Sequence, residues 1–425
     1  MKRKVSALIL AVLLGGSAAV GCGAESGDDL SAEYSAGTGE TAETETEISQ
    51  EAYDDIISYL TGGEVSAEDV LYTVNGVEIT AAEYFYYVTM EEYVYIYDYY
   101  YTYYTTPDLT EVQEDGSIMA EDVTADAYLT AVYDAAVYAA ALEAGVELTE
   151  EYQDALDTYA EESARTLGET SWETAVSEGT ISEDDYTEEE KENWIAETGG
   201  EQFILNSLYY STTEDAQISA YERSCYAEVY RDILFGEGGE LEPSDEEIDT
   251  YISENGVYAC RYILIDDYED SAEGKAMAEE IYEELSSLSG DEFDEAFLEY
   301  CSDNADGNTT GEYVYDSSDS VAEGFPEAVE SLNTGEMGIT DETVYGYFIV
   351  VRDEVSEDSV LTSANSTILD LYISEAFQEL GEEWYDEAEV IYSGALDEIE
   401  VADYFDALEA FREILEAAVS AQAAE

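Results

Sequence analysis

Histidine is absent from this 425-residue chain. Ser-His-Asp and Cys-His hydrolases are therefore excluded, and so are metal sites that depend on imidazole ligands. Cysteine is scarce as well: apart from Cys22, the chain holds only Cys225, Cys260 and Cys301. An odd number of thiols cannot all pair within one chain, and their spacing fits no zinc motif. We expect small buried thiols, no metal site and no cofactor.

Basic residues are also few. The chain has 11 Lys and Arg against 106 Asp and Glu, which gives a formal net charge of −95 at pH 7. A polyanion of this size repels nucleic-acid phosphates, so binding to DNA or RNA is excluded. The charge fits either a solubilising surface or an attraction for basic segments of unfolded proteins. No EF-hand is present, because a loop around Gly307 would need acidic ligands at Ser302 and Tyr313. Loose surface binding of divalent cations stays open.

The first residues have the pattern of an export sequence. Lys2, Arg3 and Lys4 precede an apolar segment, Val5 to Leu14, that is too short to span a bilayer as a helix. Small residues then lead to Cys22, as in a bacterial lipobox, where the cysteine is acylated. We predict a signal peptide over residues 1–21 and a lipid anchor at Cys22, on the extracytoplasmic face of the bacterial cell membrane. An ordinary secretory sequence with a chance cysteine is the alternative.

Local patterns divide the segment that follows. Residues 22–66 are rich in Glu, Ser, Thr and Gly and are predicted to form a disordered acidic tether, with a short helix around Tyr53–Leu60 as an option. Asn75-Gly76 lies between two short apolar runs, which predicts a β-hairpin. Thr80 and Glu83 then have the spacing of a capping box that opens a helix.

Tyrosine is concentrated in that helix. Eleven tyrosines lie between residues 84 and 104. The residues that can share one helical face are Tyr86, Met90, Tyr97, Tyr101 and Tyr104. One interpretation is a packed, amphipathic core helix. The other is a surface that binds unfolded chains, because tyrosine combines a large apolar ring with a polar tip.

The remaining patterns predict an α+β chain. Further amphipathic helices are expected up to about residue 236, and a domain boundary near 242. Residues 243–355 change to the order strand, helix, helix, helix, strand. Helices return after 356. We therefore predict a mostly helical domain built from residues 67–242 and 356–425, with a small α+β domain, 243–355, inserted between its two segments.

Four segments of the inserted domain resemble, in order and spacing, the signature of parvulin prolyl isomerases (rotamases). They are residues 261–265, 293–303, 324–338 and 345–351. The hairpin and capped helix near residue 80 are similar to the start of the chaperone domain of PrsA- and SurA-like foldases. The resemblance implies an extracytoplasmic foldase whose partners are unfolded or proline-containing secreted polypeptides. The oligomeric state stays open, a homodimer included.

The resemblance also implies a site. Phe325 and Val321 match the apolar wall of the family's proline pocket, Asp303 its Cys/Asp position and Thr343 its hydroxyl position. The positions of the two family histidines hold Tyr262 and Phe348. The resulting assignments are catalytic for Asp303, Tyr262 and Thr343, and substrate-binding for Phe325, Val321 and Phe348.

Loss of both histidines leaves two functions open. The first is a foldase with prolyl cis-trans isomerase activity, reduced by the replacements. The second is a non-catalytic holdase that keeps the fold and binds extended segments. A surface solute-binding lipoprotein is a third idea. It requires a two-lobed α/β fold with parallel strands, and the long helical runs argue against it.

Overall fold

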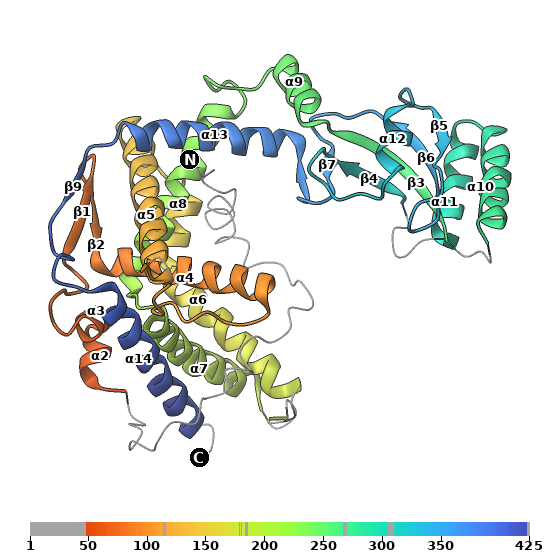
Figure 1. Cartoon of the computed structure of the whole chain (residues 1–425). Helices are drawn as coiled ribbons and strands as arrows, with labels where there is room; N and C mark the ends of the chain where they lie inside the picture. The colour runs from red at the N-terminus through yellow and green to blue at the C-terminus, as the bar shows by residue number, and fades with distance from the viewer. Residues whose placement is uncertain are drawn as a thin grey trace. The chain divides into compact units, whose positions relative to one another are not determined.

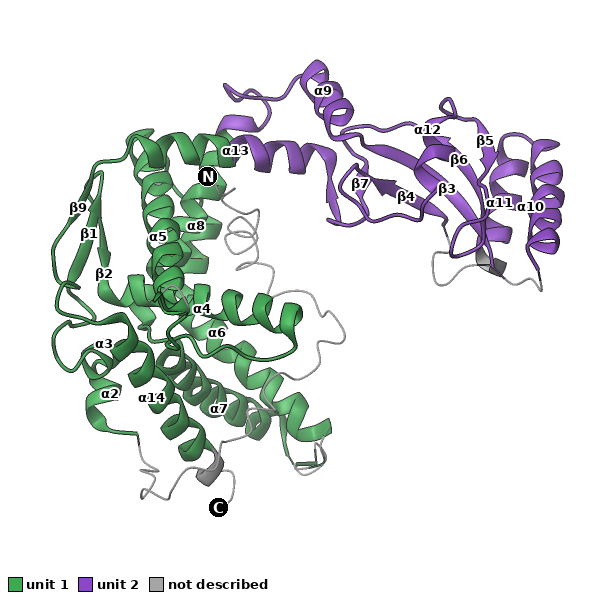
Figure 2. Ribbon diagram, viewed as in Figure 1, with its two compact units in different colours: residues 1–233, 378–425 green, residues 234–377 purple. Residues whose placement is uncertain are grey.

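The structure is a computed structural model that describes residues 48–113, 116–177, 179, 181–182, 186–266, 270–304 and 310–422. For 302–304 and 420–422 the description covers the backbone alone. The predicted signal peptide, Cys22 and the first part of the predicted tether lie outside these residues. The chain divides into two compact units, Met1–Ile233 with Gln378–Glu425, and Leu234–Phe377 (Figure 2). Within the described ranges, no helix is long and apolar enough to cross a membrane.

The first unit is mostly helical and carries one small sheet (Figure 1). Its strands β1, β2 and β9 pair in the order β2-β1-β9, and both pairings are antiparallel. The strands are β1 (Val70–Val74), β2 (Val77–Thr80) and β9 (Val390–Tyr392). The helices are α2 (Gln50–Asp54), α3 (Ile56–Leu60), α4 (Ala81–Tyr103), α5 (Met119–Glu143), α6 (Glu150–Ser177), α7 (Glu188–Tyr209), α8 (Glu214–Phe235) and α14 (Val401–Gln422).

Local sequence determines how α4 begins. Asn75 and Gly76 both have positive φ, 49° and 90°, and join β1 to β2 as the predicted hairpin. The Thr80 side chain accepts from the Glu83 backbone N–H, and the Glu83 carboxylate accepts from the Thr80 N–H at 2.6 Å. The predicted capping box is therefore confirmed. It satisfies two donors that a helix start leaves open.

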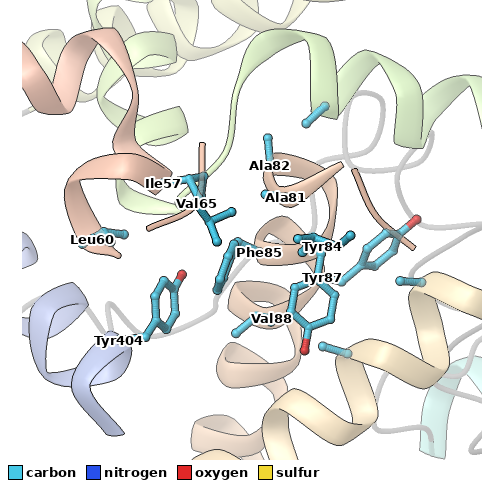
Figure 3. Packing of buried hydrophobic residues seen from close by; sticks show 14 of the residues in the cluster. Ile57, Leu60, Val65, Ala81, Ala82, Tyr84, Phe85, Tyr87, Val88 and Tyr404 are labelled. Carbon is cyan, nitrogen blue, oxygen red and sulfur yellow. The ribbon is translucent and has the colours of Figure 1, made fainter. Parts of the chain in front are cut away.

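The C-terminal segment completes the core that the N-terminal segment begins. Helix α14 packs against α3, α5 and α7. Its residues Tyr404, Leu408 and Phe411 are buried in one cluster with residues of α3 and α4. Tyr404 stacks on Phe85 with ring centroids 4.4 Å apart (Figure 3). The predicted helical domain made of two distant segments is thus present.

The folded region begins earlier than the predicted tether allows. Residues 50–60 form α2 and α3, and Ile56, Ile57 and Leu60 are buried in the core of the first unit. The Asp55 side chain caps α3 by accepting from the Ser58 N–H at 2.9 Å. Residues 50–60 are therefore folded, whereas the sequence predicted a disordered tether up to residue 66 with a short helix there only as an option. The physical reason is that a few apolar residues of this segment pack into the core of the first unit, although the surrounding composition is polar.

The tyrosine-rich helix α4 has two different halves. All buried positions of this helix lie between Ala81 and Glu92. The second half carries exposed rings: Tyr97 is 41% exposed, Tyr101 57% and Tyr104 81%. The core-helix interpretation therefore fits the first half, and the second half is a surface.

Helices α6 and α7 touch through glycines. Gly168 lies against the backbone of Ile195, and Gly199 lies against the backbone of Ala164. A Cβ atom at either glycine would collide with a carbonyl oxygen of the facing helix. Glycine is required here for space, because the backbones approach too closely for any side chain.

A buried polar network crosses the core of the first unit. Arg223 of α8 donates to the Glu83 carboxylate at 2.7 Å and to the Glu78 carbonyl at 3.0 Å. Tyr87 donates to Asp134 Oδ2 at 2.6 Å. Burial raises the pKa of the Asp134 carboxyl to about 6, and the hydrogen bond from Tyr87 and the charge of Arg223 oppose that rise.

A second, partly buried ion pair connects α14 to α4. Arg412 donates to both carboxylate oxygens of Glu92, at 2.8 and 2.9 Å. The guanidinium also lies over the Tyr209 ring, 4.5 Å from its centroid. A bidentate pair of this kind is among the stronger polar contacts in proteins.

The second unit is a small α+β unit with a four-stranded antiparallel sheet of order β4-β3-β6-β5. The strands are β3 (Tyr258–Ile265), β4 (Glu312–Tyr315), β5 (Met337–Ile339) and β6 (Tyr347–Asp353), with a separate pair β7 (Val360–Leu361) and β8 (Ser366–Thr367). The helices are α9 (Asp245–Asn255), α10 (Ser271–Ser286), α11 (Asp291–Asn304), α12 (Phe325–Glu330) and the start of α13 (Ile368–Asp386).

The predicted α+β class is confirmed, and the insertion has somewhat wider limits than predicted. Compact unit 2 runs from residue 234 to 377, whereas the sequence predicted 243–355. The difference arises because the pair β7-β8 and the first turns of α13 pack with α9, in a cluster that includes Ile248, Leu361 and Ile368. Every strand pair in the described part is antiparallel, unlike the parallel sheet that a solute-binding lipoprotein would need.

Candidate functional site

The two faces of the second unit's sheet have different partners. Along β3, Ile263 and Ile265 pack with α10 and α11, whereas Tyr262 and Leu264 point to the opposite face. This alternation follows from the two-residue period of a strand. On β6, Phe348 pairs with Leu264 and lies on that opposite face. Helix α12 covers part of it.

Three of the residues predicted from the sequence meet on this face. The ring of Tyr262 lies 5.8 Å from that of Phe325 and 5.6 Å from that of Phe348, and Phe325 and Phe348 are 5.0 Å apart. All three contacts are edge-to-face, an arrangement that contributes about 0.5–1.5 kcal/mol per pair beyond burial. Phe325 and Phe348 are buried, and Tyr262 is half-buried. Tyr262 is therefore the member that solvent or a ligand can reach.

A glycine with a left-handed backbone conformation positions Phe325. Gly324, with φ 92°, precedes α12, Phe325 is its first residue, and Pro326 follows in the first turn. Proline fits there because the first turn of a helix needs no N–H partner. Val321, just before this turn, is half-buried and packs against the same cluster. Four of the six predicted positions thus lie together.

The aromatic face continues onto β4, which the sequence did not predict. The ring centroid of Tyr313 lies 6.1 Å from those of Tyr262 and Phe325, and the ring centroid of Tyr315 lies 6.0 Å from that of Phe325. Burial raises the pKa of both tyrosines. The alternation of Tyr313, Val314 and Tyr315 is a strand pattern that could have revealed them.

Thr343 has a different surrounding from the other predicted positions. Its hydroxyl donates to the Gly346 carbonyl at 2.8 Å and accepts from the Tyr345 N–H at 3.2 Å, which closes the turn before β6. The hydroxyl next to the aromatic face belongs to Thr340. That side chain is buried and accepts from the Phe348 N–H at 2.9 Å. Sequence analysis missed Thr340, which lies directly after the short strand β5.

Asp303 lies in the last turn of α11, and its side chain is outside the described part of the chain. Its proposed role stays a prediction. Cys301 of the same turn donates its Sγ–H to the Tyr262 carbonyl, with 3.3 Å between sulfur and oxygen. Burial raises the pKa of the Cys301 thiol to about 11, so the group is a neutral donor at pH 7. The end of α11 is thus held against β3 at Tyr262.

Metal ligands are not gathered at this face. In the ranges given above for the structure, no group of three or more Cys, Asp or Glu side chains is placed to hold a metal ion. The chemistry that the face offers is that of aromatic rings, the partly exposed tyrosines Tyr262 and Tyr313, and buried hydroxyl and thiol groups.

Comparison with known families assigns this region. Residues 252–358 match the model of one family, the PPIC-type PPIase domain. The parvulin resemblance predicted from the sequence is thereby confirmed for the PPIC-type segment. The segment contains every residue of the aromatic face, and Thr340, Thr343 and Asp303 as well. Among curated proteins, none matches the chain.

Solved structures with some likeness to the chain are PrsA proteins. Foldase protein PrsA from Streptococcus pneumoniae is 18% identical, with 62% of this chain and 90% of that chain covered and a TM-score of 0.20. PrsA from Bacillus subtilis is 16% identical, with coverages of 72% and 92% and a TM-score of 0.22. Peptidylprolyl isomerase (PrsA) from Bacillus cereus is 15% identical, with coverages of 62% and 85% and a TM-score of 0.20. At these TM-scores the likeness carries no inference by itself.

The sequence resemblance predicts that the PPIC-type segment departs from the parvulin pattern at two positions. The two positions for which the resemblance implies histidine, Tyr262 and Phe348, are neighbours whose rings touch. Tyrosine can donate one hydrogen bond and phenylalanine none, whereas a pair of imidazoles could donate and accept. The replacements keep ring volume and remove most of the polar capacity.

Proposed function

We propose that this chain is an extracytoplasmic foldase, held at the membrane by a lipid on Cys22, that binds proline-containing segments of unfolded secreted proteins. The observation that carries the proposal is the mutual contact of Tyr262, Phe325 and Phe348 on one sheet face of the PPIC-type segment. The export pattern before Cys22 supports the location, and the two-segment helical unit supports a chaperone role.

Rotation about an X–Pro bond needs no covalent step. The barrier comes from amide resonance, about 18–20 kcal/mol for a peptide bond. A site lowers it by binding the twisted amide more tightly than the planar one. In this proposal the proline ring lies against the half-buried Tyr262 and Val321, and the buried Phe325 and Phe348 support them. The planar amide is the more polar form, so an apolar, water-poor contact favours the twisted form.

We propose a reduced isomerase activity for the same reason. Without imidazoles at positions 262 and 348, the hydrogen bonds that could stabilise a twisted amide are limited to the Tyr262 hydroxyl and to Asp303. These replacements also favour a second function, a holdase whose aromatic face binds proline-containing segments without rotating them. In both cases the face is a binding surface, and only turnover differs.

A matched pair of variants tests the proposal in a protease-free assay of cis-trans exchange in a proline peptide. Phe325→Leu alters the aromatic face, and Phe297→Leu makes the same change on the opposite face of the same sheet, where Phe297 is fully buried. We expect Phe325→Leu to lower the catalysed rate about tenfold and Phe297→Leu to leave it unchanged in the folded protein.

Two outcomes would contradict parts of the proposal. A wild-type rate equal to that of buffer would remove the isomerase and leave the holdase. Binding of the same peptide, measured by fluorescence anisotropy, then decides whether the face is used at all. Equal binding by the wild type and Phe325→Leu would show that the aromatic face is not the proline site.

A further inference from the structure

The second half of α4 exposes a row of tyrosines. Tyr93, Tyr97 and Tyr101, called here the tyrosine stripe, are 55%, 41% and 57% exposed. Neighbouring rings lie 6.2 and 4.5 Å apart, because residues four apart share one helix face. Exposed aromatic area of this kind marks interaction surfaces on soluble proteins.

The stripe has a strongly anionic setting. Helix α4 contains no Lys or Arg, and Asp98 beside the stripe is exposed. The last turn adds the negative end of the helix dipole, with no basic residue to offset it. A hydrogen bond with Tyr101 raises the pKa of Tyr97 above its ordinary value of 10.0, and a phenol with either pKa is neutral at pH 7. The rings therefore offer neutral π faces within a negative field.

The same fold already uses tyrosine rings to hold cations. The guanidinium of Arg412 lies 4.5 Å from the centre of the Tyr209 ring, and that of Arg352 lies 4.9 Å from the Tyr258 ring. An approaching Lys or Arg would find the same contact on the stripe. Such contacts are stronger for Arg or Lys over tyrosine than for neutral side chains.

The spacing selects an extended partner. Successive tyrosines of the stripe are four residues apart along a helix, about 6 Å. Alternate side chains of an extended polypeptide repeat every ~6.6 Å on the same side. An extended segment lying along α4 therefore keeps nearly the same repeat as the helix positions of the stripe, whose ring centroids lie 6.2 and 4.5 Å apart, and can place alternate side chains beside successive tyrosines.

We propose that the tyrosine stripe of α4 binds extended polypeptide segments with Lys or Arg at alternate positions, by cation–π contacts. The inference rests on the client-binding role proposed above, but it concerns a surface outside the PPIC-type segment. The net charge of −95 attracts such segments from a distance, and the ring faces hold them at contact range.

The test uses the full chain and a short synthetic peptide in which Lys alternates with Ser and no proline occurs. Binding is followed by fluorescence anisotropy at low salt and at about 1 M salt, where the Debye length is ~3 Å. The test pair is Tyr97→Leu with Tyr101→Leu, and the rescue pair is Tyr97→Phe with Tyr101→Phe. The control pair, Tyr53→Leu with Tyr345→Leu, removes two tyrosines that are also exposed but belong to other segments of the chain than α4.

We expect the Leu pair on the stripe to bind about fivefold to tenfold more weakly at both salt concentrations. The Phe pair and the control pair should bind like the wild type, because the first keeps the ring faces and the second leaves the stripe intact. Circular dichroism should be the same for all four proteins.

Equal binding by the wild type and the stripe Leu pair would overturn the proposal, since the general charge would then explain the attraction. Equal weakening by the Phe and Leu pairs would overturn it too, because hydroxyl groups would be the binding element. Since the peptide has no proline, the absence of isomerase activity would not affect either result.

Discussion

Replacement of Asp134 by Asn should remove a pH-dependent loss of stability from the first unit. Burial raises the pKa of this carboxyl from its ordinary value of 3.8 to about 6 in the folded chain. Between these values the folded chain keeps the proton and the unfolded chain has released it. The contribution of Asp134 to the free energy of unfolding is therefore highest below pH about 4 and falls as pH rises through about 6. At about 1.36 kcal/mol per pKa unit, the loss amounts to ~3 kcal/mol.

The contacts of Asp134 explain why the ionised form is costly. Tyr87 donates one hydrogen bond to Oδ2, whereas Oδ1 is buried and has no hydrogen-bond partner within the described residues. Arg223 supplies a charge but pairs directly with Glu83. An asparagine of the same shape can accept from Tyr87 through its carbonyl and never ionises.

Urea unfolding of the full chain, followed by circular dichroism from pH 4 to 8, measures the effect. Because the chain has a net charge of −95, general repulsion also changes with pH in the wild type. Asp122→Asn serves as the control, since Asp122 is an exposed carboxylate on the same helix α5. We expect Asp134→Asn to gain stability over wild type as pH rises, and Asp122→Asn to follow the wild type. Parallel curves for the two variants would refute the buried-carboxylate reasoning.

Three other changes test separate features. Glu92→Gln should cost about 1–3 kcal/mol in urea unfolding, because it leaves the partly buried Arg412 without its ion pair. A loss well below about 1 kcal/mol would mean that the pair behaves as an exposed one. Gly199→Ala should lower the free energy of unfolding of the first unit, because the added Cβ collides with the Ala164 carbonyl. Gly200→Ala should raise it by about 0.5–1 kcal/mol, because no atom lies near the added Cβ. Similar effects of the two variants would contradict the close contact between the helices. Cys22→Ala should release the protein from the membrane fraction and abolish fatty-acid labelling, and retention with label would place the lipid elsewhere.

Local patterns in the sequence predicted the elements that depend on neighbouring residues. Asn75-Gly76 forms its hairpin and Thr80 with Glu83 forms the capping box, because both involve only residues a few positions apart. The start of the folded region was misplaced for the opposite reason. The ring of Tyr59 in α3 packs on Phe411, 5.5 Å away, a partner that lies far along the chain.

The candidate site also contains some residues that the sequence predicted and others that it did not. The family resemblance led to Tyr262, Phe325 and Phe348, and their rings do meet. Strand β4 was missed because it has only four residues, and its pairing with β3 spans about fifty residues of chain. Thr340 was missed because its hydroxyl caps a neighbouring strand's N–H, a contact that no spacing along the chain reveals.

The place of α14 in the core sets the order in which the two units can fold during synthesis. Its residues Tyr404 and Phe411 fill the space beside Phe85 and Tyr59, so the first unit lacks part of its interior until the last helix has been made. The second unit is continuous in sequence and has its own hydrophobic core, so it can fold while the first unit still lacks α14. In a chain that ends before residue 401, the second unit would be folded, but the apolar core residues of the first unit would stay exposed. Quality-control proteases can recognise such a chain.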